Sequence, residues 1–103
     1  GVYCASKRAL QPICEAMRME TLGQNVRVTS VDPGMVDTEF STVRFHGDED
    51  KAKQVYKGVR PLVANDVADC VLFAANRPAH VNLDTILVMP TDQASPQMVH
   101  RAE

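Results

Sequence analysis

The sequence has no tryptophan, and only two tyrosines and three phenylalanines supply its aromatic side chains. It also has no apolar run near the roughly 20 residues that a membrane-spanning helix needs. The first residues show no charged segment followed by an apolar stretch, the pattern of a secretion signal. We therefore expect a cytoplasmic protein without a membrane partner.

A strong charge of either sign is missing as well. The formal net charge is −2, and the basic residues are scattered along the chain rather than gathered in a stripe. This pattern excludes a basic surface for nucleic acid. The hydrophobic share of 45% and the charged share of 23% are ordinary for a folded domain, and 103 residues suffice for one small domain or part of one.

Cysteine and histidine pairs at metal-binding spacing are also absent. The three cysteines form no CxxC pair, and the three histidines are too widely spaced for two ligands on one helix face. We expect reduced thiols in the core, no disulfide framework and no metal site. The residues concerned are Cys4, Cys14, Cys70, His46, His80 and His100.

Two helices and two strands are predicted from the periodicity. Residues 3–22 have apolar positions three and four apart and are followed by Gly23, which predicts a helix with a kink at Pro12. A second helix is expected with Asn65 as its N-cap.

The predicted strands are two short runs that each reach a proline, the first rich in β-branched residues and the second apolar. They are residues 26–34 and 85–90, and we expect both to be buried in a parallel sheet. A loop with a short helix after Asp48 separates the first strand from the second helix, and the tail from Thr91 has no period. This alternation indicates an α/β fold, but two strands are too few for such a sheet, so the chain looks like the second half of a larger domain.

The stretch YCASK places a phenol and an ammonium four residues apart, on one face if it is helical. A phenol has a pKa near 10, and bringing it to about 7 takes roughly 4 kcal/mol. An ammonium about 4 Å away supplies about 1 kcal/mol in water and about 4 kcal/mol at an effective dielectric of 20. Lys7 therefore activates Tyr3 only inside a walled cleft; the alternative is an exposed pair on a helix surface.

Together with a second motif, this stretch resembles the short-chain dehydrogenase/reductase family. Tyr3 and Lys7 match its tyrosine-x-x-x-lysine signature, and Pro33, Gly34 and Thr38 in DPGMVDT match the proline-glycine turn that follows a strand. The resemblance implies the C-terminal half of a doubly wound parallel-sheet Rossmann-like domain. Residues 1–103 would be one part of that single domain, without its N-terminal cofactor-binding half.

The same resemblance implies the role of each site residue. Tyr3 would exchange a proton with the substrate oxygen while hydride passes to or from the nicotinamide, and Lys7 would assist it and bind the nicotinamide ribose. The turn would line the nicotinamide, and Thr38 would reach toward the phosphates. The implied cofactor-binding residues are Tyr3, Lys7, Pro33, Gly34, Val36 and Thr38.

A closer likeness narrows the substrate. The stretches DTEFSTVRFHGDEDKA, RPAHVNLDTILVMPTDQAS and VHR look like the NADP-dependent 3-hydroxy acid dehydrogenase subfamily. This implies small 3-hydroxy acids such as serine, or small aldehydes, as substrates, and NADP as cofactor, with NAD still open. Arg44 is a candidate for binding a substrate carboxylate. Pairing of Arg44 with Glu39 or Asp48 at the surface is the alternative.

The glycine-rich phosphate-binding motif of the family does not occur in these residues. We therefore expect the chain to be a C-terminal fragment that is inactive by itself. The alternative to an enzyme is a non-catalytic association module that uses the apolar faces of residues 10–22 and 67–74. A homo-oligomer through the Tyr3 helix and the 67–74 helix is expected from the resemblance.

Overall fold

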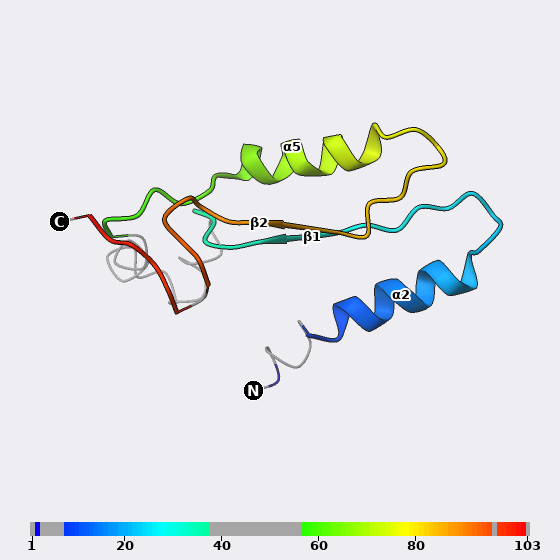
Figure 1. Ribbon diagram of the computed structural model, residues 1–103, viewed down its shortest axis with the longest axis horizontal. Coiled ribbons are helices and arrows are strands. Elements are labelled where there is room, and N and C mark those ends of the chain that lie inside the picture. The colour runs from blue at the N-terminus through cyan, green and yellow to red at the C-terminus, as the bar shows by residue number, and fades with distance from the viewer. Residues whose placement is uncertain (1, 3–7, 38–56, 96, 103) are drawn as a thin grey trace. The chain divides into compact units, whose positions relative to one another are not determined.

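A computed structural model describes residues 2, 8–37, 57–95 and 97–102. In chain order its elements are α2 (Leu10–Glu20), β1 (Ser30–Pro33), α5 (Ala64–Ala75) and β2 (Thr85–Val88), as Figure 1 shows. The short helix expected after Asp48 lies outside the described residues. In the ranges given above, no helix is both long enough and apolar enough to cross a membrane.

The two strands form a parallel sheet, as the sequence predicts (Figure 1). The backbone N–H of Ser30 donates to the carbonyl of Asp84 at 3.0 Å, and that of Gly34 donates to the carbonyl of Val88 at 2.7 Å. Both partners advance by four residues in the same direction, which defines a parallel pairing. Because α5 lies between the strands in sequence, β1, α5 and β2 make up a βαβ unit.

The helix α2 begins at Leu10, so Pro12 lies in its first turn. A proline is tolerated there because the first N–H groups of a helix have no partner inside it. The chain is helical at Arg8 and turns at the next residue, before α2 starts, so the helix is interrupted ahead of Pro12 rather than kinked at it. The helix ends at Glu20, and Gly23 follows with a φ of +86°, which suits a glycine after a helix end.

The helix α5 begins two residues earlier than an N-cap at Asn65 would imply. Its first residue is Ala64, so Asn65 lies inside the first turn and the prediction that Asn65 is the N-cap was wrong. The carboxylate of Asp66 instead accepts a hydrogen bond of 2.8 Å from the backbone N–H of Val63. An acidic residue in the first turn reaches back to the chain ahead of the helix, as in a capping box, and also complements the helix dipole.

The strands are shorter and more exposed than predicted. Residues 26–29 are not strand, and the N–H of Val28 donates to the side-chain carbonyl of Asn82 at 2.7 Å instead of to a strand neighbour. Side chains of β1 are half-buried, and those of β2 alternate between exposed and half-buried. Among the described residues Val28, Val59 and Pro90 are buried, and none of them lies in a strand. The expectation of two buried strands was therefore wrong. A strand is buried only when further strands and helices pack around it, and a sheet of two strands offers few such neighbours.

The chain divides into two compact units. The first comprises residues 1–31 and 70–86. Two arginines, Arg18 and Arg27, make hydrogen bonds between its segments. Arg18 donates to the carbonyl of Val28 at 3.1 Å and pairs with the carboxylate of Asp84 at 2.9 Å. Arg27 donates to carbonyls at the C-terminal end of α5, where cations are favourable because of the unpaired carbonyls.

The second unit comprises residues 32–69 and 87–103. Its C-terminal tail lies along the segment that precedes α5. The N–H of Ala102 donates to the carbonyl of Gly58 at 2.8 Å, and the guanidinium of Arg101 donates to the carbonyl of Lys57 at 2.7 Å. The tail that shows no period in the sequence is therefore tied down by hydrogen bonds.

Candidate functional site

The structure describes three of the seven residues that the sequence assigns to a site. Tyr3, Lys7, Thr38 and Arg44 lie outside the described residues, and their roles stay predictions. The three that are described are Pro33, Gly34 and Val36, at the carboxyl end of β1. Ligands of open α/β sheets bind beyond this end of the strands, so the turn is where a cofactor site is expected.

The turn after β1 is held on two sides by backbone hydrogen bonds. Pro33 ends the strand, and the N–H of Gly34 makes the bond to Val88 described above. Val36 then forms a parallel bridge with Leu62, on the segment that leads into α5. In this bridge the N–H of Leu62 donates to the carbonyl of Met35, and the N–H of Asp37 donates to the carbonyl of Leu62, both at 2.8 Å. The turn is therefore fixed between β2 and residues 60–62.

Gly34 leaves space at this turn for two neighbouring side chains, and its backbone angle does not call for a glycine. Its φ lies outside the left-handed region, which Gly23 and Gly58 do adopt. A Cβ at position 34 would lie 2.5 Å from the side-chain oxygen of Gln93 and 3.0 Å from the Cγ of Met89. The missing side chain thus makes room for the segment that follows β2.

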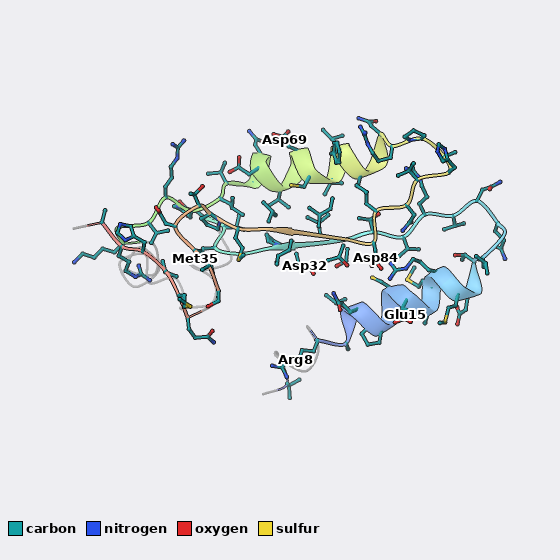
Figure 2. The ribbon with its side chains drawn as sticks, in the orientation of Figure 1. Arg8, Glu15, Asp32, Met35, Asp69 and Asp84 are labelled. Carbon is teal, nitrogen blue, oxygen red and sulfur yellow. The ribbon has the colours of Figure 1, made fainter. Side chains whose placement is uncertain are left out.

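A glutamine that the sequence reasoning missed completes the turn. The side-chain oxygen of Gln93 accepts a hydrogen bond of 2.9 Å from the N–H of Met35, a residue that Figure 2 labels just beyond β1. The amide nitrogen of Gln93 donates to the carbonyl of Ser95 at 3.3 Å. A signal that could have directed attention to it is the rule that ligands bind beyond the carboxyl ends of parallel strands, since Gln93 follows β2.

A hollow of about 470 Å³ lies beside the carboxyl end of β2. It shares Leu62 and Met89 with the surroundings of the turn. Its wall is mixed, with apolar side chains from the segments before α5 and after β2 and charged side chains from residues 60–69. The lining residues are Arg60, Pro61, Leu62, Asp66, Asp69, Val88, Met89, Pro90 and Thr91.

Metal ligands do not gather in the part of the chain that the structure describes. Within it, no group of three or more His, Cys, Asp or Glu side chains could hold a metal ion. Cys14 and Cys70 are free thiols, as predicted, but they are half-buried rather than enclosed in a core. The described part of the site is a hydrogen-bonded backbone turn whose side-chain neighbours are Met89 and the amide of Gln93.

Comparison with known proteins finds similarity to dehydrogenases and other oxidoreductases. A sequence profile of short chain dehydrogenases matches residues 1–49. An uncharacterized oxidoreductase of Mycobacterium tuberculosis is 53% identical over 93 residues, which are 90% of this chain and 37% of that protein. An NADP-dependent 3-hydroxy acid dehydrogenase of Schizosaccharomyces pombe is 45% identical over 103 residues, which are 100% of this chain and 40% of that protein.

A solved structure agrees in fold over nearly the whole chain. It is the closed form of a serine dehydrogenase complexed with NADP+, at 40% identity and a TM-score of 0.88, and the match covers 98% of this chain and 42% of that one. The chain thus spans about two fifths of the length of the relatives it matches. The predicted fold class, half of a doubly wound parallel-sheet domain, is confirmed. The chain is therefore similar to short chain dehydrogenases through residues 1–49, and to named dehydrogenases over nearly its whole length.

Proposed function

We propose that the protein containing these residues is an NADP-dependent oxidoreductase. It transfers hydride between the nicotinamide and the alcohol or carbonyl of a small 3-hydroxy acid or aldehyde. The observation that carries this proposal is the likeness, over the whole chain, to a protein named as an NADP-dependent 3-hydroxy acid dehydrogenase. The sequence match to serine 3-dehydrogenase of Agrobacterium fabrum, 38% identical over 91% of this chain, supports the same substrate class.

The chemistry is assigned to residues by the sequence motif. Tyr3 acts as the acid or base at the substrate oxygen, and Lys7 lowers the pKa of its phenol electrostatically and binds the nicotinamide ribose. Lys7 and Tyr3 are both retained at the family spacing, which supports these roles. Thr38 reaches toward the phosphates, and Arg44 binds the carboxylate of the substrate.

The turn after β1 provides the nicotinamide site in this proposal. Pro33, Gly34 and Val36 line the ring, and the backbone of the turn meets its carboxamide. The fixed hydrogen bonds on both sides of the turn support this assignment, because a binding surface that is already ordered loses little entropy when the ligand binds. NADP is the cofactor assigned; NAD is the alternative.

Residues 1–103 serve as the C-terminal part of a single dehydrogenase domain, and by themselves they are inactive. Half of the site belongs to segments that carry the glycine-rich motif. A cytoplasmic location is part of the proposal and rests on the sequence.

The second candidate function is association without catalysis. Leu10, Ile13 and Met17 on α2 are each about half exposed, as are Val71 and Phe73 on α5. Apolar stripes of this kind mark surfaces that another layer of protein covers. In an oligomeric enzyme these faces serve as subunit contacts, so they are consistent with both functions, and activity decides between them.

The test is made on the complete gene product and not on the 103 residues alone. Purified protein is mixed with NADP+ and serine, allo-threonine or another small 3-hydroxy acid, and formation of reduced cofactor is followed by absorbance. Tyr3→Phe should lower kcat at least about a hundredfold, because loss of a general acid or base costs two to four orders of magnitude. Tyr56→Phe, the other tyrosine of the chain, is the matched control and should stay near the parent value. If the parent protein binds no nicotinamide cofactor, the oxidoreductase proposal is refuted, and association without catalysis is the remaining candidate function.

A further inference from the structure

The backbone hydrogen bonds between β1 and β2 end at Gly34, the first residue of the turn. The last ladder bond joins the N–H of Gly34 to the carbonyl of Val88, the final residue of β2. The next N–H along the chain belongs to Met35, and the acceptor it finds is the side-chain oxygen of Gln93 at 2.9 Å. A side-chain amide therefore serves as the acceptor for the first backbone N–H beyond the ladder.

The position of that amide is itself determined on several sides. The backbone N–H of Gln93 donates to the carbonyl of Pro90 at 3.0 Å, and Gln93 forms an antiparallel bridge with Val99. Its side-chain nitrogen donates to the carbonyl of Ser95. The two ends of the amide thus face different partners, and this hydrogen-bond network fixes which end is the oxygen.

Fixing the N–H of Met35 also fixes the preceding carbonyl. The peptide bond between Gly34 and Met35 is planar and trans, so its N–H and its C=O point in opposite directions. A hydrogen bond that aims the N–H of Met35 at Gln93 thereby aims the carbonyl of Gly34 away from Gln93. The side chain at position 93 sets the direction of a backbone group in the turn that we assign to the nicotinamide.

We propose that Gln93 is a positioning residue for nicotinamide binding. It acts through the Gly34–Met35 peptide and does not touch the cofactor. This inference rests on the proposed function, and it goes beyond it by assigning a role to a residue outside the family motifs. We expect the effect at the nicotinamide end of the cofactor, because the Gly34–Met35 peptide belongs to the turn assigned to the nicotinamide, whereas the glycine-rich motif that binds phosphates in this family does not occur in these residues.

The test compares binding of two ligands by the complete gene product. One ligand is NADP+, and the other is its adenosine bisphosphate fragment, which has no nicotinamide. Gln93→Met keeps the length of the side chain and removes the acceptor, and it should weaken NADP+ binding about tenfold while the fragment binds as before. Gln93→Glu keeps an acceptor for Met35 but turns a second oxygen toward the carbonyl of Ser95, so it should bind NADP+ more weakly than the parent and more tightly than Gln93→Met.

Gln97→Met is the matched control, since Gln97 is an exposed glutamine of the same tail. It should alter neither affinity. If Gln93→Met does not fold, Gln93→Asn replaces it, because its amide is one methylene too short to reach Met35. Equal weakening of both ligands, unchanged NADP+ binding, or a Gln93→Glu variant as poor as Gln93→Met would each overturn the inference. A parent protein that binds neither ligand would instead refute the proposed function.

Discussion

Replacing Gly34 with alanine tests whether the turn is shaped by the residues packed against it. The new Cβ would lie 2.5 Å from the side-chain oxygen of Gln93 and 3.0 Å from the Cγ of Met89. Since non-bonded heavy atoms sit at about 3.5 Å, the amide must retreat by about 1 Å. That movement carries its oxygen out of hydrogen-bond range of the N–H of Met35, which it now meets at 2.9 Å.

The cost follows from the two contacts. Leaving a partly buried N–H without its acceptor costs about 1 kcal/mol, at the low end for unsatisfied groups. Crowding of Met89 adds about 1 kcal/mol of overpacking. We expect Gly34→Ala to lower the free energy of unfolding by about 2 kcal/mol.

A double-mutant cycle with Gln93→Ala isolates the contact. In the Gln93→Ala background the amide is gone and Met35 has already lost its acceptor, so Gly34→Ala should cost less than about 1 kcal/mol. Urea denaturation of the complete gene product, followed by circular dichroism, measures all four proteins. A coupling energy of at least about 1 kcal/mol is expected for residues in contact. Additive losses would refute the reasoning, because the two positions would then act independently.

Two further predictions concern stability away from the turn. Gly58→Ala should lower the free energy of unfolding by at least twice the roughly 1 kcal/mol expected for Gly23→Ala. Both glycines have positive φ, but only at Gly58 would a Cβ overlap the backbone of the tail. Equal losses in urea denaturation would contradict this prediction. Asp84→Asn should lower the free energy of unfolding by less than about 0.5 kcal/mol, because it removes only a half-exposed ion pair that solvent screens. Arg18→Met should lower it by about 1 kcal/mol, because the carbonyl of Val28 also loses its donor. A larger loss for Asp84→Asn, in the same assay, would show that the ion pair dominates.

The elements could be predicted because their signals are local. Apolar residues three and four apart identify the helix that contains Leu10–Glu20, and short runs of β-branched or apolar residues that reach a proline identify both strands. Their ends could not be predicted, because distant partners decide them. The first strand starts at Ser30 and not at Val26, since the side chain of Asn82 takes the N–H of Val28.

Burial was the part of the fold that the sequence misjudged. A hydrophobic pattern shows which face of an element is apolar, but it does not show what covers that face. Ile13 and Val71 lie on the predicted apolar faces of α2 and α5, yet both are about half exposed. The pattern is typical of elements inside a larger sheet domain, and the chain spans about two fifths of the length of the relatives it matches.

The candidate site was partly predictable for the same reason. The proline-glycine turn is a local motif, and the structure places it at the carboxyl end of β1 as expected. Gln93 lies 58 residues from Met35 in sequence, and no local pattern connects them. The reason for glycine at position 34 was likewise hidden, because it depends on this distant amide.

The pH dependence of alcohol oxidation tests the central claim, that Lys7 makes the phenol of Tyr3 acidic enough to act as a base. In the complete gene product, kcat/KM should rise with pH through an apparent pKa well below the value near 10 of an ordinary tyrosine. In Lys7→Met the phenolate loses its stabilising cation, so this pKa should move up by one unit or more. An unchanged profile in Lys7→Met, with activity retained, would contradict the account.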